Sequence, residues 1–86
     1  MKSELIIDKY GVKRWYLNSE LHREEGPAVE WNNGRKEWHI NGQLHREDGP
    51  AIEGNNNKYW YINGKQYTEP EHKHEIRSIK LLKLLK

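Results

Sequence analysis

"LHREEGP" occupies residues 21–27 and "LHREDGP" occupies residues 44–50, so nearly the same heptapeptide is written twice with starts 23 residues apart. The match extends on both sides, because "WYLNSELHREEGPAVEW" at residues 15–31 aligns with "WHINGQLHREDGPAIEG" at residues 38–54. A third, partial copy, "KYWYINGKQY" at residues 58–67, keeps the Trp-x-Ile-Asn-Gly core and lacks the heptapeptide. Self-similarity at a fixed period predicts a tandem-repeat architecture.

Each repeat is predicted to form a β-hairpin. The segments "AVEW" and "RKEWHIN" place Val, Ile and Trp at alternating positions, and "NNG" at residues 32–34 tolerates the positive φ of a tight turn. The next copy repeats this logic, and "LIID", "KYG" and "VKRWYLN" form a lead hairpin upstream. We therefore expect a mainly β protein, an antiparallel meander of about six strands over residues 1–67. The repeats span about residues 1–20, 21–43 and 44–67, and the heptapeptides connect the hairpins.

Side-chain alternation along the strands assigns two faces to this sheet. The face expected to be buried carries one Trp and one aliphatic residue per repeat, and three further apolar residues join it. These residues are Trp15, Leu17, Trp38, Ile40, Trp60, Ile62, Val29, Trp31 and Ile52. The opposite face carries Tyr16, His39 and Tyr61. We interpret this row of rings either as a solvated sheet surface or as a binding surface that stacks on a base, a sugar or a protein partner.

Residues 68–86 are predicted to form an amphipathic C-terminal α-helix that belongs to the same domain. "TEPE" at residues 68–71 has the spacing of a capping box, with Pro in the first turn. Ile76, Ile79 and Leu82 share one side of the helix. Because a single sheet needs a cover over its apolar face, we expect a helix from about residue 69 to residue 85, packed on the Trp-bearing face.

Three leucines of the same segment point away from the covering side. Leu81, Leu84 and Leu85 make the last turns apolar around most of the helix circumference. An exposed patch of this kind is unusual on a small monomer. The sequence therefore predicts an oligomer interface at these leucines, forming a homodimer or a higher homo-oligomer.

Composition limits the class of protein. A chain of 86 residues with no Cys forms one small domain without disulfides or thiolate metal sites. No apolar run approaches the roughly 20 residues of a membrane span, and the first residues lack the apolar stretch of a signal peptide. We expect a soluble cytoplasmic protein that does not bind membranes.

Charge and histidine spacing limit the partners. The net charge of +2 is too small to indicate a general affinity for nucleic acid. Residues 20–53 carry eight acids against four bases whereas the tail from His72 onward is basic, so the body and the tail can bind each other or oppositely charged partners. His72 and His74 are two apart and diverge on a helix, so no metal site is expected, and no motif indicates a cofactor.

The heptapeptide carries more chemistry than a turn needs. Arg23 and Arg46 offer planar forks for carboxylate or phosphate, and His22 and His45 can donate or accept hydrogen bonds near neutral pH. One interpretation is structural, in which these side chains bond the neighbouring repeat and hold the stack in register. The other is a binding row for an anionic group of a ligand or partner, bordered by Tyr16, His39 or Tyr61.

The repeated pattern Trp-Tyr/His-Leu/Ile-Asn-Gly followed by Leu-His-Arg-x-x-Gly-Pro-Ala resembles the variant MORN-type hairpin repeats of small proteins from tailed phages and giant viruses. The resemblance covers residues 6–67, with Asn18-Ser19 in place of the usual Asn-Gly and Gly54 in place of Trp31. It implies a single-layer β-meander that binds proteins, lipids or small ligands. For a phage protein of this size it further suggests a counter-defence role in the host cytoplasm.

Three classes of function follow. The favoured one is a non-enzymatic binding module that blocks a host immune protein or sequesters a phosphate-bearing nucleotide signal. The second is a structural or assembly component that oligomerises through its helix. The third is a small phosphodiester-cleaving enzyme in which His22 or His45 acts with Glu24 or Glu47 and Arg holds the phosphate. Because no nucleophile or paired-carboxylate motif accompanies these residues, we do not expect an enzyme.

Overall fold

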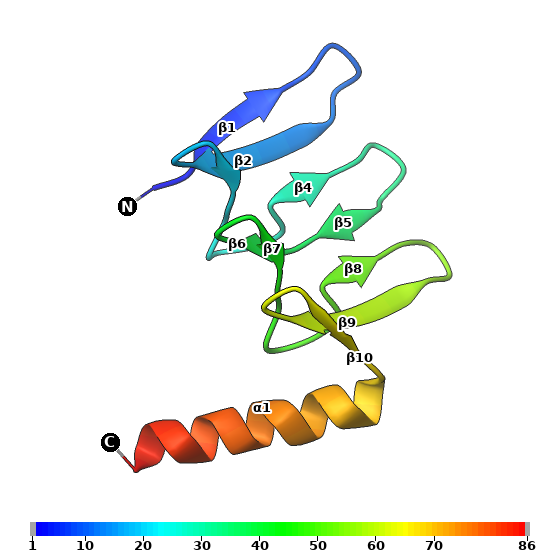
Figure 1. Ribbon diagram of the computed structural model, residues 1–86. Helices are drawn as coiled ribbons and strands as arrows, with labels where there is room; N and C mark the ends of the chain where they lie inside the picture. The colour runs from blue at the N-terminus through cyan, green and yellow to red at the C-terminus, as the bar shows by residue number, and fades with distance from the viewer. Residues whose placement is uncertain (1, 86) are drawn as a thin grey trace.

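The computed structural model describes residues 2–85, and positions 1 and 86 of the expected domain ranges lie outside them. As the sequence predicts, the protein is mainly antiparallel β-sheet followed by a C-terminal helix. The repeats lie side by side, from β1 (Glu4–Ile7) at one end to α1 (Glu69–Leu84) at the other (Figure 1). The molecule measures 45 × 33 × 17 Å, so the sheet is a single thin layer.

Within residues 2–85 the repeats form ten short strands, where about six were expected. After β1 these strands are β2 (Lys13–Leu17), β3 (Glu20–Leu21), β4 (Val29–Glu30), β5 (Lys36–Glu37), β6 (His39–Ile40), β7 (Gln43–Leu44), β8 (Ile52–Glu53), β9 (Lys58–Ile62) and β10 (Lys65–Tyr67). The main sheet has the order β1-β2-β4-β5-β8-β9-β10, with β3 also paired to β2, and β6 and β7 form a separate pair. The meander therefore keeps the chain order of the repeats.

The strand number is higher because each repeat contains two hairpins. The segment predicted as one strand over residues 35–41 divides at Trp38 into β5 and β6, and β6 then turns back into β7. Equivalent second hairpins join β2 to β3 and β9 to β10. Leu21 and Leu44 consequently belong to strands, and only the remainder of each heptapeptide is a connector.

The second hairpins turn through two residues that both have positive φ. Asn41 and Gly42 have φ values of 51° and 80°. Two consecutive left-handed residues are typical of the type I′ turn, whose twist matches that of the flanking strands and which favours Asn-Gly. The first repeat makes the same turn at Asn18 and Ser19, and Ser19 has a φ of 67° that is unfavourable for a residue with a Cβ atom.

The Ala after each Gly-Pro closes the hydrogen-bond ladder between repeats. The Trp15 amide donates to the Ala28 carbonyl at 2.8 Å, and the Ala28 amide donates to the Glu37 carbonyl at 2.7 Å. Trp38 and Ala51 repeat the first of these bonds at 2.8 Å. Both Ala residues are 0% exposed, so a larger side chain would displace its neighbours.

The pairing register corrects the expected assignment of the sheet faces. Val29 pairs with Arg14 and Glu37, and Ile52 pairs with Glu37 and Tyr59. Paired residues point to the same side of a sheet, and neighbours along a strand point to opposite sides. Val29 and Ile52 are therefore on the side opposite Trp15, Trp38 and Trp60, and the expectation that they join this Trp face is wrong. The same correction applies to Trp31, which is two residues after Val29 and continues its pairing opposite Arg35.

The row of rings on that opposite side is not a solvated surface. Tyr16 and Tyr61 are half-buried, and His39 is buried with 9% exposure. The same side carries the buried Val29 and Ile52. The apolar residues of the repeats are divided between the two faces of the sheet. The side that carries the rings therefore also contains buried residues.

Helix α1 begins with the predicted capping box and is anchored to the last repeat. The Thr68 hydroxyl accepts from the Glu71 amide at 3.3 Å, and the Glu71 carboxylate accepts from the Thr68 amide at 2.9 Å. His72 Nε2 lies 2.7 Å from the Arg46 carbonyl oxygen, and His72 and Ile76 are the buried residues of the helix. The helix is thus fixed at its first turns.

The helix covers the end of the stack, which corrects the expectation that it overlies three Trp residues. It packs against β9 and β10 (Figure 1) and borders a groove that contains Trp60. Trp15 and Trp38 are covered by Arg23 and Arg46. Because these arginines already occupy the space over two of the rings, the helix meets an uncovered Trp only at the last repeat.

The type I′ turns allow a matched test of backbone strain. Ser19→Gly should raise the free energy of unfolding by about 0.5–1 kcal/mol, because Gly adopts positive φ without a Cβ clash. Gly64→Ser should lower it by a similar amount, since Gly64 has a φ of 82° and the nearest side-chain atom lies 3.5 Å from an added Cβ. Urea denaturation of both variants measures the effect. Shifts of the same sign would contradict this account of the turns.

Candidate functional site

The first connector, residues 22–27, places an arginine on a tryptophan ring. The guanidinium carbon of Arg23 lies 3.8 Å from the centroid of Trp15. Its Nη1 donates to the Pro27 carbonyl at 3.2 Å and to the Glu30 carboxylate at 3.1 Å. One side chain thus joins the Trp of β2, its own turn and the strand β4 that follows.

The second connector, residues 45–50, repeats the arrangement. The guanidinium carbon of Arg46 lies 3.7 Å from the Trp38 ring centroid, and Nη1 donates to the Pro50 carbonyl at 3.1 Å and to Glu53 at 3.4 Å. Nε donates in addition to Asp48 at 3.0 Å. Both predicted anion-binding arginines are therefore already paired with carboxylates of the protein itself.

The glycine of each connector makes room for this guanidinium. A Cβ atom at Gly49 would lie 2.9 Å from the guanidinium carbon of Arg46, and one at Gly26 would lie 3.2 Å from that of Arg23. These glycines therefore allow a close approach of the guanidinium, and a Cβ atom at either position would require the arginine to shift.

The connector histidines bond the turn of the next repeat. His22 Nδ1 accepts from the Asn41 amide at 2.9 Å, and His45 Nδ1 accepts from the Asn63 amide at 3.0 Å. An accepting Nδ1 assigns the ring proton of the neutral imidazole to Nε2. For His22 this nitrogen lies 3.7 Å from the Glu24 carboxylate. The contacts of His and Arg therefore match the structural interpretation of the heptapeptide.

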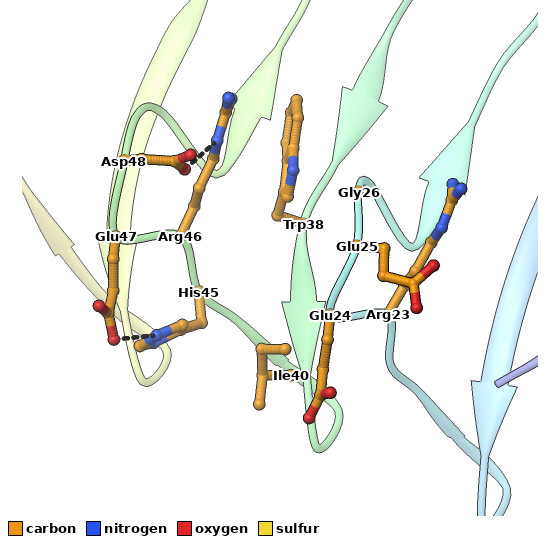
Figure 2. A pocket seen from close by; sticks show the side chains of 10 residues that line it. All are labelled: Arg23, Glu24, Glu25, Gly26, Trp38, Ile40, His45, Arg46, Glu47 and Asp48. Carbon is orange, nitrogen blue, oxygen red and sulfur yellow. Dashed lines mark hydrogen bonds and ion pairs between the residues drawn. The ribbon is translucent and has the colours of Figure 1, made fainter. Parts of the chain in front are cut away.

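A groove lies between the two connectors and is the candidate binding site (Figure 2). We call it the connector groove. The Trp38 ring stands between Arg46 and the turn at Gly26, and Ile40 adds apolar surface below it (Figure 2). The remaining lining residues are Arg23, Glu24, Glu25, His45, Glu47 and Asp48.

Carboxylates dominate the accessible part of the connector groove. The side chain of Glu24 is 75% exposed, whereas that of Arg46 is 20% exposed. Glu25 is also exposed. The groove therefore presents negative charge around an aromatic floor, and a cationic group is the better electrostatic match.

The side of the sheet that carries Tyr16, His39 and Tyr61 contains an ionic network that sequence reasoning missed. Glu37 accepts from Arg35 at 3.0 Å and lies 3.0 Å from His39 Nε2, and these contacts, first with His39 and then with Arg35, hold the pKa of Glu37 below its ordinary value. Arg35, Glu37 and His39 alternate along one stretch of chain, which is the sequence signal that places them on one side. Among the described residues, His39 Nδ1 is a buried atom without a hydrogen-bond partner.

A second groove, which we call the helix groove, lies between the second connector and α1. It contains Trp60, Ile76, Arg77 and Lys80. Its residues are not among the expected site residues. The signal in the sequence is the third, partial copy at residues 58–67, which has Trp60 but no heptapeptide and so supplies no arginine to cover the ring.

The predicted oligomer interface is exposed. Leu81, Leu84 and Leu85 are 57%, 80% and 83% exposed. Leu82, which was expected to face the sheet, is exposed as well, because α1 contacts the sheet mainly through its first turns. Self-association through these leucines stays a prediction.

Comparison with models of protein families, with curated proteins and with solved structures gave no match to this chain. The resemblance to MORN-type repeats therefore stays an expectation. In residues 2–85 no three His, Asp or Glu side chains gather as a metal site would require. The described part of the chain has no helix with the length and apolar character needed to cross a membrane.

The arginine stack predicts a specific loss of stability. Arg46→Gln and Arg46→Lys should each lower the free energy of unfolding by about 1.5–3 kcal/mol, because both lose the planar fork that bonds the Pro50 carbonyl and Glu53. Arg77→Gln is the control, since Arg77 is exposed and forms no ion pair among the described residues. Urea denaturation measures the change, and an unaltered midpoint in both Arg46 variants would contradict a structural use.

The lowered pKa of Glu37 predicts an acid-dependent stability. A depressed carboxylate pKa stabilises the fold above the unfolded value of about 4.3 and stops doing so as the pH falls through the folded value. Glu37→Gln should therefore make stability less steeply dependent on pH below about pH 5. Some slope should remain, because Arg14 lowers the pKa of Asp8 and the Thr68 amide lowers that of Glu71.

Denaturation at a series of pH values checks this expectation. The control is Glu25→Gln, a charge change at an exposed connector residue. A Glu37→Gln variant with the wild-type pH profile would contradict the assignment of the network around His39.

Proposed function

We propose that this protein is a non-enzymatic binding module that recognises a basic segment of a protein partner through the connector groove. The observation that carries the proposal is the division of charge in the connectors. Arg23 and Arg46 are turned onto Trp rings and bonded internally, whereas Glu24 and Glu25 face solvent. A Lys or Arg side chain of a partner would meet carboxylates at the rim and the Trp38 ring below them.

The groove also supports a peptide-like partner by its composition. Trp38 and Ile40 offer apolar surface, and the rim offers acceptors from two successive connectors. Tryptophan is enriched among the residues that dominate protein interfaces. A partner segment with alternating basic and apolar residues therefore fits this surface better than a small inorganic anion does.

The connector histidines favour binding over catalysis. Nδ1 of His22 and Nδ1 of His45 accept hydrogen bonds from the backbone amides of Asn41 and Asn63. Removing either ring therefore disturbs a turn as well as any chemistry. A general base needs a ring nitrogen free to take a proton from the substrate. This commitment speaks against the phosphodiester-cleaving alternative with Glu24 or Glu47.

The narrower proposal concerns the partner. Following the resemblance to phage repeat proteins, we propose that the partner is a host immune protein that the module blocks. The nucleotide alternative at Arg23 and Arg46 is less well supported, because each guanidinium is already paired with Glu30 or Glu53. Assembly through Leu81, Leu84 and Leu85 is compatible with either partner.

Fluorescence anisotropy with two labelled peptides tests the connector groove. One peptide alternates Arg and Leu, and the other carries Glu in place of Arg. We expect the basic peptide to bind more tightly, with an affinity that falls as salt is added. The double variant Glu24→Gln and Glu25→Gln should weaken it by about 10-fold or more, because each charged hydrogen bond contributes about 1.5–3 kcal/mol.

The matched control is the double variant Glu4→Gln and Glu75→Gln, which changes the net charge equally outside the groove. It should retain most of the affinity for the basic peptide. Equal losses in the two double variants would indicate a nonspecific charge effect and refute the groove. Tighter binding of the acidic peptide would reverse the proposal in favour of an anion row at Arg23 and Arg46.

A further inference from the structure

The third repeat departs from the other two at its tryptophan. Trp15 and Trp38 each have a guanidinium within 3.8 Å of the ring centroid, supplied by the residue eight positions later. The residue eight positions after Trp60 is Thr68, which caps α1. Among the described residues no cation lies over the Trp60 ring. Trp60 thus lacks the arginine that covers Trp15 and Trp38.

Helix α1 borders the space beside this ring without filling it. The helix groove has Trp60 and Pro50 on the repeat side and Ile76 and Leu81 on the helix side. A groove with an aromatic ring and aliphatic walls favours a flat apolar group. This shape is absent from the connector groove, where the arginine occupies the corresponding position against Trp38.

The charged residues of the helix groove determine which ligand charge it favours. Its acidic residues are paired, because Asp48 bonds Arg46 at 3.0 Å and Glu69 lies 3.7 Å from Lys73. Glu47 lies 3.8 Å from Lys83. Arg77 and Lys80 also line the groove, and within residues 2–85 neither forms an ion pair. The uncompensated charge beside Trp60 is therefore positive.

We propose that the helix groove is a second binding site, independent of the connector groove, for a small ligand that joins a planar ring to an anionic group. The ring stacks on Trp60, and the anion binds Arg77 and Lys80, which lie one helical turn apart. Both a nucleoside phosphate and a simple aromatic anion have this chemistry. Stacking alone and charge alone are each weak at so exposed a site, so the ligand must carry both parts.

Four probes separate the two parts of the ligand. Adenosine monophosphate and naphthalene-2-sulfonate carry a ring and an anion, adenosine carries only the ring, and inorganic phosphate carries only the anion. Titrations are followed by NMR through the indole N–H signals of the four Trp residues. We expect saturable shifts of the Trp60 signal with adenosine monophosphate and naphthalene-2-sulfonate. Adenosine and inorganic phosphate should bind at least about 10-fold more weakly.

Variants with matched controls locate the site. Trp60→Leu should abolish the binding of both ring-bearing anions, whereas Trp31→Leu removes a Trp that lines neither groove and should leave the affinity unchanged. The double variant Arg77→Gln and Lys80→Gln should weaken binding about 10-fold or more. Lys13→Gln with Lys36→Gln removes two charges from the sheet and should have little effect beyond general screening. These residues are not those tested for the connector groove, so the two proposals can fail separately.

The outcomes divide as follows. Binding of adenosine monophosphate alone assigns the site to nucleoside phosphates, and binding of naphthalene-2-sulfonate alone assigns it to aromatic anions without a sugar; both results support the proposal. Inorganic phosphate that binds as tightly as adenosine monophosphate would overturn it. The proposal also fails if neither ring-bearing anion shifts the Trp60 signal, or if the Trp31→Leu variant loses binding while Trp60→Leu retains it.

Discussion

The stacking of a connector arginine on a tryptophan ring is the interaction on which the architecture depends. A sheet one layer thick cannot bury a Trp row between two layers, and the rings would otherwise face water. The guanidinium of Arg46 covers Trp38 while its N–H groups bond the Pro50 carbonyl and Glu53. A planar cation is suited to this position, because it presents an apolar face to the ring and donors around its edge. Gly49 completes the arrangement by leaving room for it.

The sequence predicts which secondary-structure elements form better than it predicts which side chains share a face of the sheet. The antiparallel strands and the capping box at Thr68 follow from local patterns, and the structure confirms them. The second hairpins at Asn41-Gly42 and Asn63-Gly64 also carry a local signal, which was assigned to the ends of long strands. No local pattern indicated that Val29 and Ile52 lie on the side opposite Trp38. An apolar residue in the sequence is expected to be shielded from water, but the residue type does not show whether an arginine or the packed core shields it.

The same reasoning explains what could be predicted of the candidate sites. Recurrence of His22 and Arg23 at His45 and Arg46 indicated that the residues matter, but not whether they serve the repeats or a ligand. That distinction depends on where each donor points, and the partner atoms of Arg23 come from Pro27 and Glu30. The helix groove depends on an absence, since Trp60 has no arginine over its ring only because the third copy has no heptapeptide. Such a feature becomes visible only when the copies are compared in space.

Each connector bonds the hairpin with the Asn turn that follows it along the chain. His22 accepts from the Asn41 amide, and the Arg23 amide donates to the His39 carbonyl, so each connector is completed by the repeat that comes after it. A heptapeptide is therefore useful only where another Asn-turn follows, and the partial copy at residues 58–67, which is followed by α1, has no heptapeptide. In such a nearest-neighbour array each added unit contributes its own stack and one interface. The length of this protein is accordingly adjustable in principle: a further 23-residue unit inserted ahead of Leu44 would find every bonding partner it needs, and the stack would lengthen without any change to its ends.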